Sequence, residues 1–402
     1  MTTAKAGPLD DLVVVDLSRA VAGPHATMML GDLGARVIKV EAPGSGDDAR
    51  GWGPPFMTTE SGVPESTYFL SANRNKESIC LDLKDPADVE VLGELVRRAD
   101  VLVENFRTGV MDRLGLGADW LAELNPRLVL LSITGFGHDG PEGGRPGYDQ
   151  IAQGEGGLMS VTGSGADDPQ KFGTPICDLL AGMNGAYGVL AALHERSRSG
   201  RGQTVRTSLL AAAVGVHAFQ GTRWTVAGEV GRAAGNHHAA IAPYGLFRCA
   251  DGSVQIAVGT ETQWQRFCAG FGIDPALPGL ATNQERVVRR DEVINLVEKV
   301  FSTWKAADLL DRLNSVGIPA GKVRSIDEVY TWDQTRSQGL LVDVDHDTLG
   351  KITLPGPPLR FFEPAGTEHT RTTHRPPPRL DQHGSAIRWW ISDEPQLNAE
   401  DC

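Results

Sequence analysis

The chain has few cysteines and no metal-type histidine spacing, and these shortages exclude two kinds of site. Its 402 residues include five cysteines, an odd number, with no C-x-x-C pair. Disulfide frameworks and zinc ribbons need paired or closely spaced cysteines, so a reducing cytoplasm is the expected location. The ten histidines include one adjacent pair, His237-His238, and no His-Glu-x-x-His motif. We therefore expect no metal ion and no permanently bound cofactor.

Positive charge and long apolar runs are also scarce. Lysine and arginine total 38 against 51 acidic residues, which gives a net charge of −13. This balance argues against nucleic acid and against an anionic membrane as partners. The longest apolar run, 179–193, contains Asn184 and is shorter than the ~18 residues of a spanning helix. Asp10 and Asp11 stand where a signal peptide would need its apolar core.

The sequence does contain an alternation of short apolar strands and helices. Strands are expected over 12–16, 36–41, 100–104 and 127–133, and helices over 23–33, from Pro86 onward and within 110–124. Strands that alternate with helices predict a parallel sheet with helical crossovers, as in a large Rossmann-like α/β domain.

The character of the chain changes after about residue 222. A strand pair over 245–249 and 253–258 flanks Asp251-Gly252, and amphipathic helices are expected over 261–271, 291–304 and 307–316. This pattern predicts a smaller α+β domain. The expected division is a large α/β domain over 1–222, a small α+β domain over 223–335, a return segment completing the large domain over 336–391, and a disordered tail over 392–402.

The first strand–loop–helix–strand unit lacks the glycines of a dinucleotide site. Its loop, 18–24, reads Ser-Arg-Ala-Val-Ala-Gly-Pro, although Glu41 stands where an acidic residue could hold a ribose. Without G-x-G-x-x-G the backbone cannot approach a pyrophosphate in the usual way, so NAD is not expected. Basic residues near strand ends could neutralise other phosphates, although a single arginine is more often a solvated surface charge. They are Arg19, the 73–76 run, Arg107, Arg113 and Arg145.

Asp178 is the most informative single position. It follows Gly173-Thr174-Pro175 and directly precedes the longest apolar run. Aspartate is a preferred helix N-cap, but a carboxylate at such a place can also be a nucleophile toward an acyl group. The local residues leave both interpretations open. The glycine- and proline-rich loop at Tyr148-Asp149 could form a site rim or hold a core tyrosine at a turn.

Several short motifs, in their order along the chain, resemble the class III CoA-transferases, which include formyl-CoA, carnitine and bile-acid CoA-transferases. The resemblance spans residues 8–365. Its marks are Ala22-Gly23-Pro24 with 33–41, Gly44-Ser45-Gly46-Asp47 with Arg50-Gly51-Trp52, 73–79, 103–107 with Asp112-Arg113-Leu114-Gly115, and Gly200-Arg201-Gly202-Gln203.

The resemblance implies a mechanism and a set of site residues. Asp178 would attack an acyl-CoA thioester, form an aspartyl anhydride and then an aspartyl-CoA thioester, and pass CoA to a carboxylic acid; the helix N-terminus would keep it ionised. The CoA thioester is then a substrate, and an interlocked homodimer is implied. The implied CoA contacts are Arg19, Ala22, Arg74, Lys76, Asn105, Phe106, Arg113 and Arg145, with Tyr148 and Trp52 at the acyl rim.

Two other functions share this fold or this site. A 2-methylacyl-CoA racemase needs a histidine opposite an aspartate, and its histidine falls at Tyr148, whose unperturbed pKa near ~10 makes a poor base. A non-catalytic acyl-CoA-binding protein is the other alternative. The intact Gly173, Pro175 and Asp178 argue against it.

Overall fold

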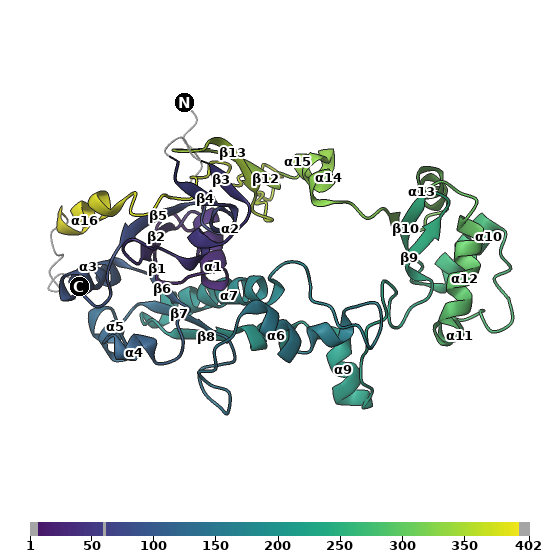
Figure 1. The fold of residues 1–402 in the computed structure, drawn as a ribbon, viewed down its shortest axis with the longest axis horizontal. Helices are drawn as coiled ribbons and strands as arrows, with labels where there is room; N and C mark the ends of the chain where they lie inside the picture. The colour runs from purple at the N-terminus through teal and green to yellow at the C-terminus, as the bar shows by residue number, and fades with distance from the viewer. Residues whose placement is uncertain (1–6, 59–61, 394–402) are drawn as a thin grey trace. The chain divides into compact units, whose positions relative to one another are not determined.

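The computed structural model describes residues 7–58 and 62–393, which fall into two compact units (Figure 1). Unit 1 comprises Met1–Leu158, Phe172–Thr222 and Asp333–Cys402, and unit 2 comprises Met159–Lys171 and Arg223–Trp332. The sequence-based division differs here: residues 159–171 group with unit 2, and unit 2 ends at Trp332. Residues 392 and 393 of the predicted tail belong to helix α16 (Gly384–Asp393), and the rest of that predicted segment lies outside the described residues.

Unit 1 is built on a six-stranded parallel sheet in the order β5-β2-β1-β6-β7-β8, which can be followed in Figure 1. The strands are β1 (Val13–Asp16), β2 (Arg36–Glu41), β5 (Lys76–Cys80), β6 (Val101–Glu104), β7 (Val129–Thr134) and β8 (Thr204–Ser208). The chain moves from β1 outward to β2 and β5, and then crosses back to β6 on the other side of β1. Ligands of such sheets bind at the carboxyl ends of the strands, near this reversal.

Helices cover both faces of the sheet, because successive strand residues point to opposite faces and both sets are apolar. Val14 and Val37 face one core, and their neighbours Val15 and Ile38 face the other. The first core is closed by α1 (Ala22–Asp32), α6 (Asp149–Glu155), α7 (Ile176–Ser199) and α8 (Leu209–Gly215). The second is closed by α3 (Pro86–Arg98), α4 (Val110–Arg113), α5 (Ala118–Leu124) and α16.

The end of unit 1 covers the free edge of β5. After the hairpin of β12 (Leu341–His346) and β13 (Gly350–Pro355), the chain runs beside this strand. The Cys80 amide donates to the Asp381 carboxylate at 2.7 Å, and the Ser78 amide donates to the His383 ring at 3.1 Å. An uncovered edge strand exposes unpaired backbone groups, so these contacts complete the sheet.

Unit 2 is a separate α+β body with its own core. Its antiparallel sheet has the order β11-β10-β9, with β9 (Tyr244–Cys249), β10 (Gly252–Ala257) and β11 (Ala320–Gly321). Three helices contribute to this core, α10 (Glu261–Phe271), α12 (Arg290–Phe301) and α13 (Ala306–Ser315), and α11 (Asn283–Val288) packs against α12. Phe247, Trp264, Phe267 and Phe301 fill the space between them.

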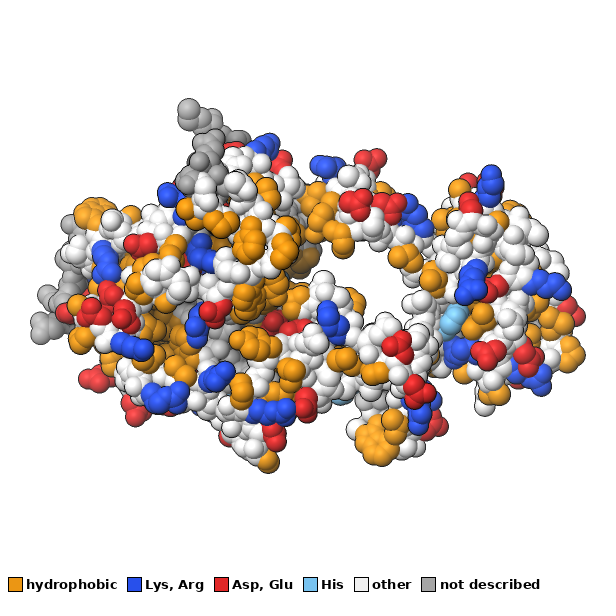
Figure 2. Space-filling model, viewed as in Figure 1, with side chains coloured by type: hydrophobic (Ala, Val, Ile, Leu, Met, Phe, Trp, Pro, Cys, Tyr) orange, Lys and Arg blue, Asp and Glu red, His pale blue; other side chains and the backbone are white. Residues whose placement is uncertain are grey.

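Helix α7 is longer than the apolar run in the sequence suggested. It has 24 residues with a mean hydropathy of 1.4, and among the described residues it alone is long and apolar enough to cross a membrane by length and composition. Its Ala181, Gly185 and Val189 lie in the core of unit 1, as in a central helix of a globular unit. On the face shown in Figure 2, basic and acidic side chains are interspersed with exposed hydrophobic ones.

Candidate active site

A pocket of ≈ 430 Å³ opens in unit 1 at the carboxyl ends of β1, β2, β5 and β6. Its apolar lining includes Leu17, Val40, Leu81, Leu83, Phe106, Val110 and Leu114. Its charged lining consists of Arg19, Lys39, Glu41, Asp47, Asp82 and Lys84. Ligand pockets commonly combine an apolar surface with a few placed polar groups, as this one does.

A two-sided hydrogen bond holds the loop at the mouth of this pocket. The Arg19 amide donates to Asn105 Oδ1 at 2.8 Å, and Asn105 Nδ2 donates to the Arg19 carbonyl at 2.7 Å. The Arg19 guanidinium lies 5.3 Å from the centre of the Phe106 ring. The structure thus brings together three of the residues expected to contact CoA, and the half-exposed Arg19 side chain remains accessible.

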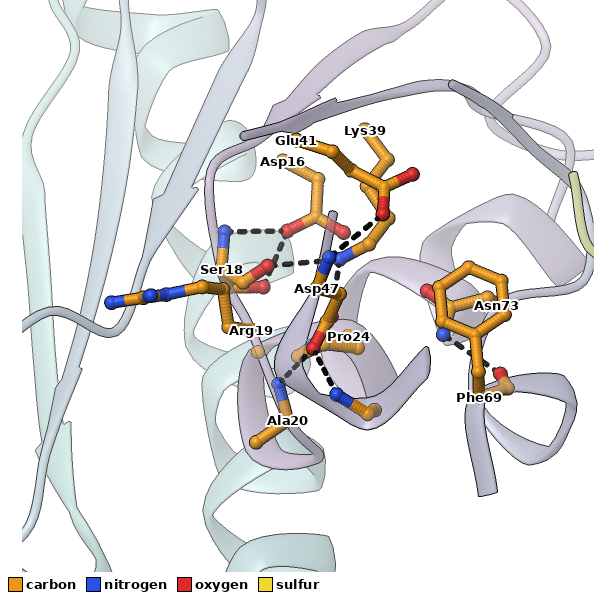
Figure 3. Close-up of polar contacts among 12 residues, drawn as sticks. Asp16, Ser18, Arg19, Ala20, Pro24, Lys39, Glu41, Asp47, Phe69 and Asn73 are labelled. Carbon is orange, nitrogen blue, oxygen red and sulfur yellow. Dashed lines mark hydrogen bonds and ion pairs between the residues drawn. The ribbon is translucent and has the colours of Figure 1, made fainter. Parts of the chain in front are cut away.

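The same loop turns at Ala20, which has a φ of 67°. A non-glycine residue in this left-handed region costs roughly 1–2 kcal/mol, so surrounding contacts must hold it. Asp47 Oδ1 accepts the Ala20 amide at 3.0 Å, and Asp47 Oδ2 lies 2.8 Å from Lys39 Nζ (Figure 3). Lys39 Nζ in turn donates to the Ser18 carbonyl at 2.9 Å. The buried Lys39–Asp47 ion pair therefore holds the turn at Ala20.

A second buried ion pair lies beside the first. Lys76 Nζ is 3.0 Å from Asp16 Oδ2 and also donates to the Pro24 carbonyl at 2.9 Å. Burial opposes ionisation of Asp16, but Lys76 and then Lys39 lower the pKa of Asp16 to about 2. Burial, together with Lys39, lowers the pKa of Lys76 to about 8. These paired charges stabilise the loop that carries the pocket.

Asp178 lies in the first turn of α7, two residues after the helix begins, and it does not cap that helix. The cap is supplied by Asp149, whose Oδ1 accepts the Cys177 amide at 2.7 Å and the Asp178 amide at 3.3 Å. Gln153 Nε2 donates to the other Asp149 oxygen at 2.6 Å. Asp149 is thus occupied by hydrogen bonds, whereas Asp178 is not required for the helix terminus.

The surroundings of Asp178 disfavour its charge. Burial first, and the Asp149 carboxylate second, raise the pKa of Asp178 to about 7. This differs from the expectation that the helix N-terminus would keep it readily ionised. A carboxyl group with a raised pKa, partly shielded from water, has the character of a functional rather than a surface aspartate.

One aromatic residue, Tyr68, interacts electrostatically with these carboxylates, and a second, Trp52, packs against Tyr68. Burial, Asp178 and Asp149 raise the pKa of Tyr68, which places its phenol within electrostatic reach of both. Trp52 meets Tyr68 edge to face, with ring centres 5.0 Å apart. Tyr148 directly precedes α6 and is exposed. Of these, Tyr68 (in α2, Thr67–Ser71) had no distinctive signal in the sequence.

A close helix contact joins Asp178 to the pocket loop. A Cβ at Gly182 of α7 would come within 2.6 Å of the Ala22 carbonyl oxygen in α1. Only glycine permits this approach, because no side chain separates the two backbones. Since α1 begins directly after the Arg19–Val21 turn, the contact fixes the distance between that turn and Asp178.

A family model described as CoA-transferase family III matches residues 9–384. The chain belongs to this family. It is 37% identical to a mouse succinyl-CoA:glutarate CoA-transferase over 378 residues, which cover 94% of this chain and 84% of the relative. It is equally 37% identical to a succinate–glutarate CoA-transferase of Agrobacterium fabrum, with 94% of each chain covered.

The solved structures agree with this family III assignment. A crystal structure of a CAIB/BAIF family protein from Brucella suis superposes with a TM-score of 0.83 at 37% identity, covering 96% of this chain and all of that one. The resemblance and the transferase class inferred from the motifs are therefore confirmed. The relatives favour a transferase over the racemase and the non-catalytic binder.

Two residues of this family III chain that were expected to contact CoA are engaged inside the protein. The basic 73–76 run leads into β5, which begins at Lys76, and the two basic side chains of this run are buried and paired. Arg74 is buried and paired with Asp32 at 2.5 Å, and Lys76 is paired with Asp16. Neither lines the pocket, and we do not include them among the proposed CoA contacts.

Three other expected contacts, Ala22, Arg113 and Arg145, are not part of the pocket lining. Ala22 is the buried first residue of α1. Arg113 is exposed at the end of α4, whose first residue, Val110, lines the pocket. Arg145 is paired with Glu155 at 2.8 Å and with Glu142 at 3.2 Å, so it would have to leave these partners to bind phosphate.

Proposed function

We propose that this CoA-transferase moves CoA from an acyl-CoA thioester to a carboxylic acid by covalent catalysis at Asp178. The observation that supports this role is that two neighbouring carboxyl groups, Asp149 and Asp178, have different surroundings. Asp149 accepts hydrogen bonds from the first turn of α7 and from Gln153, whereas Asp178 is partly buried and has a pKa raised to about 7. A desolvated carboxylate is a better nucleophile than one that water or protein donors fully solvate.

The proposed reaction balances without any other reagent. Asp178 attacks the thioester carbonyl, the carbon–sulfur bond breaks, and CoA leaves as a thiolate. The acyl group remains on the enzyme as a mixed anhydride with Asp178. The thiolate attacks the aspartyl carbon, expels the donor acid and forms an aspartyl-CoA thioester. The acceptor carboxylate then displaces the thiolate to form a second anhydride. The thiolate attacks the acceptor's acyl carbon and restores Asp178.

In this scheme the pocket binds the nucleotide part of CoA. Arg19, Asn105 and Phe106 form its mouth, and Ala22 and Arg113 are further proposed contacts. The acyl group would lie toward Asp178, beside Tyr68 and Trp52, with Tyr148 at the rim. The chemistry needs no resident cofactor, and the described residues contain no cluster of three or more potential metal ligands.

We further propose a short dicarboxylate as the acceptor, since two relatives are named for succinate or succinyl-CoA together with glutarate. The test is to incubate the enzyme with succinyl-CoA or acetyl-CoA and a panel of mono- and dicarboxylates, and to measure new CoA thioesters by mass spectrometry. Asp178→Ala should lose transfer and still bind CoA. Near-normal turnover by this variant would refute the nucleophile.

The protein is also proposed to act in the cytoplasm as an interlocked homodimer. Helix α7 exposes Met183, Tyr187 and Leu190, spaced by four and three residues along one helical face. Such a stripe can be buried by a second copy. Sedimentation at nanomolar concentration should show only a species of twice 43.0 kDa, and a folded monomer upon dilution would contradict the interlocked arrangement.

A further inference from the structure

One guanidinium connects the wall of the pocket to the aromatic residues near Asp178. Arg50 Nε and Nη2 donate to the two Glu41 oxygens at 2.7 and 2.8 Å, and Glu41 lines the pocket. Arg50 Nη2 also donates to the Pro378 carbonyl at 3.0 Å. The guanidinium carbon lies 3.7 Å from the centre of the buried Phe69 ring in α2. Bidentate pairing and stacking together are a geometry that arginine can adopt and lysine cannot.

The segment that carries Arg50 is also bonded to the start of α2. Ser66 Oγ donates to the Trp52 carbonyl at 2.5 Å. The same oxygen caps α2 by accepting the Tyr68 amide at 3.1 Å and the Phe69 amide at 3.3 Å. Trp52 meets Tyr68 through their rings. Arg50 is thus connected to both members of the Trp52–Tyr68 pair. It stacks on Phe69, which follows Tyr68 in α2, and it lies two residues before Trp52 in the chain.

We propose that Arg50 is a positioning residue for acyl transfer. It holds the Trp52–Tyr68 pair in register with the pocket wall at Glu41, so that a CoA thioester anchored in the pocket presents its acyl group to the nucleophile. This inference rests on the proposed role of Asp178. It assigns Arg50 no contact with substrate. A displacement of about 1 Å in such a support is sufficient to slow a positioned reaction many-fold.

The test compares Arg50→Lys, in the turn Asp48–Gly51, with a matched control at Arg36, the first residue of β2. Arg36 makes the same combination of contacts: its Nη2 lies 2.8 Å from Glu77, and its guanidinium carbon lies 4.1 Å from the Trp390 ring centre. Arg36→Lys should therefore lose comparable stability. Arg50→Lys should lower kcat by about tenfold or more with KM for acyl-CoA within about threefold, whereas Arg36→Lys should leave both within about twofold.

A double-mutant cycle tests whether Arg50 acts through the aromatic pair. In a Tyr68→Leu background, which removes the ring contact with Trp52, the loss of kcat caused by Arg50→Lys should shrink to about twofold, since residues that act together are not additive. If Arg50→Lys is too unstable to assay, Phe69→Leu removes the ring beneath the guanidinium, keeps the ion pair, and should lower kcat in the same sense. An equal loss in both Tyr68 backgrounds, or equal kcat for the Arg50 and Arg36 variants, would overturn the proposal.

The role of Asp178 is tested separately in the same series. If Asp178→Asn transfers CoA normally, the proposed function fails, whatever the Arg50 variants do. If Asp178→Asn is inactive and Arg50→Lys behaves as Arg36→Lys does, only the role of Arg50 fails.

Discussion

Replacing Asp178 by asparagine should make the protein more stable while removing its activity. The folded protein holds the ionised carboxylate in a partly buried place beside Asp149, which raises its pKa from 3.8 to about 7. In the unfolded chain the group has its ordinary pKa. Ionisation therefore costs folding free energy, and the neutral amide of similar shape does not carry this cost.

The expected gain follows from the size of the pKa shift. A shift of roughly three units at 1.36 kcal/mol each corresponds to about 4 kcal/mol, and residual contact of Asp178 with water reduces this to about 2 kcal/mol. The sign depends on pH. Because the folded-state pKa is raised, wild type loses stability as the pH rises from about 4 to about 7, and the loss persists above that range.

Thermal unfolding at one fixed protein concentration measures this directly. Asp178→Asn should unfold at a higher temperature than wild type at about pH 8, and the gap should narrow steadily toward about pH 5. The comparison across pH is its own control, since all other groups are shared. A gap that does not change with pH, or a variant that is less stable at about pH 8, would refute the electrostatic reasoning.

Three further outcomes are expected. The specificity constant kcat/KM should fall about tenfold per pH unit below an apparent pKa near 7, because Asp178 must be ionised to attack. In Asp149→Asn this decline should begin at a lower pH, since the neighbouring negative charge is gone; an unchanged pH profile would show that Asp149 does not raise the pKa of Asp178. Gly182→Ala should destabilise the fold by about 1–3 kcal/mol and lower kcat, because the new methyl meets the Ala22 carbonyl. Gly188→Ala on the same helix meets only a valine side chain and should spare kcat. Asn105→Ala should weaken CoA binding by about tenfold, measured by calorimetry, because the Arg19 turn loses both hydrogen bonds; unchanged affinity would remove Asn105 from the site.

The sequence predicted those parts of the fold whose residues are apolar on both faces. Strands β1, β6 and β7 are mainly such runs, β2 carries Val37, Ile38 and Val40 between charged residues, and the positions of all four were expected to within about two residues. Strand β5 starts with Lys76, whose burial depends on a distant partner, Asp16. Strand β8 (Thr-Val-Arg-Thr-Ser) is largely polar. Neither has a local pattern that distinguishes it from a loop.

The site was predicted unevenly for the same reason. Asp178 and the Arg19, Asn105 and Phe106 group are carried by short motifs, and the latter three are in contact in the structure. Of the two interpretations left open for Asp178, the structure does not bear out the N-cap, since Asp149 caps α7 across 28 residues of chain. Long-range pairing of this kind leaves no local signal, and the same holds for the position of Tyr68 beside the carboxylates.

The measurement that tests the central claim most directly is chemical trapping of the acylated enzyme. Incubating wild type with acyl-CoA and hydroxylamine, followed by digestion and mass spectrometry, should convert the Asp178 carboxyl group to a hydroxamate. The adduct should be absent without acyl-CoA and absent in Asp178→Asn. A hydroxamate on Asp149 instead, or sustained turnover of a wild-type enzyme that remains unlabelled, would contradict nucleophilic catalysis by Asp178.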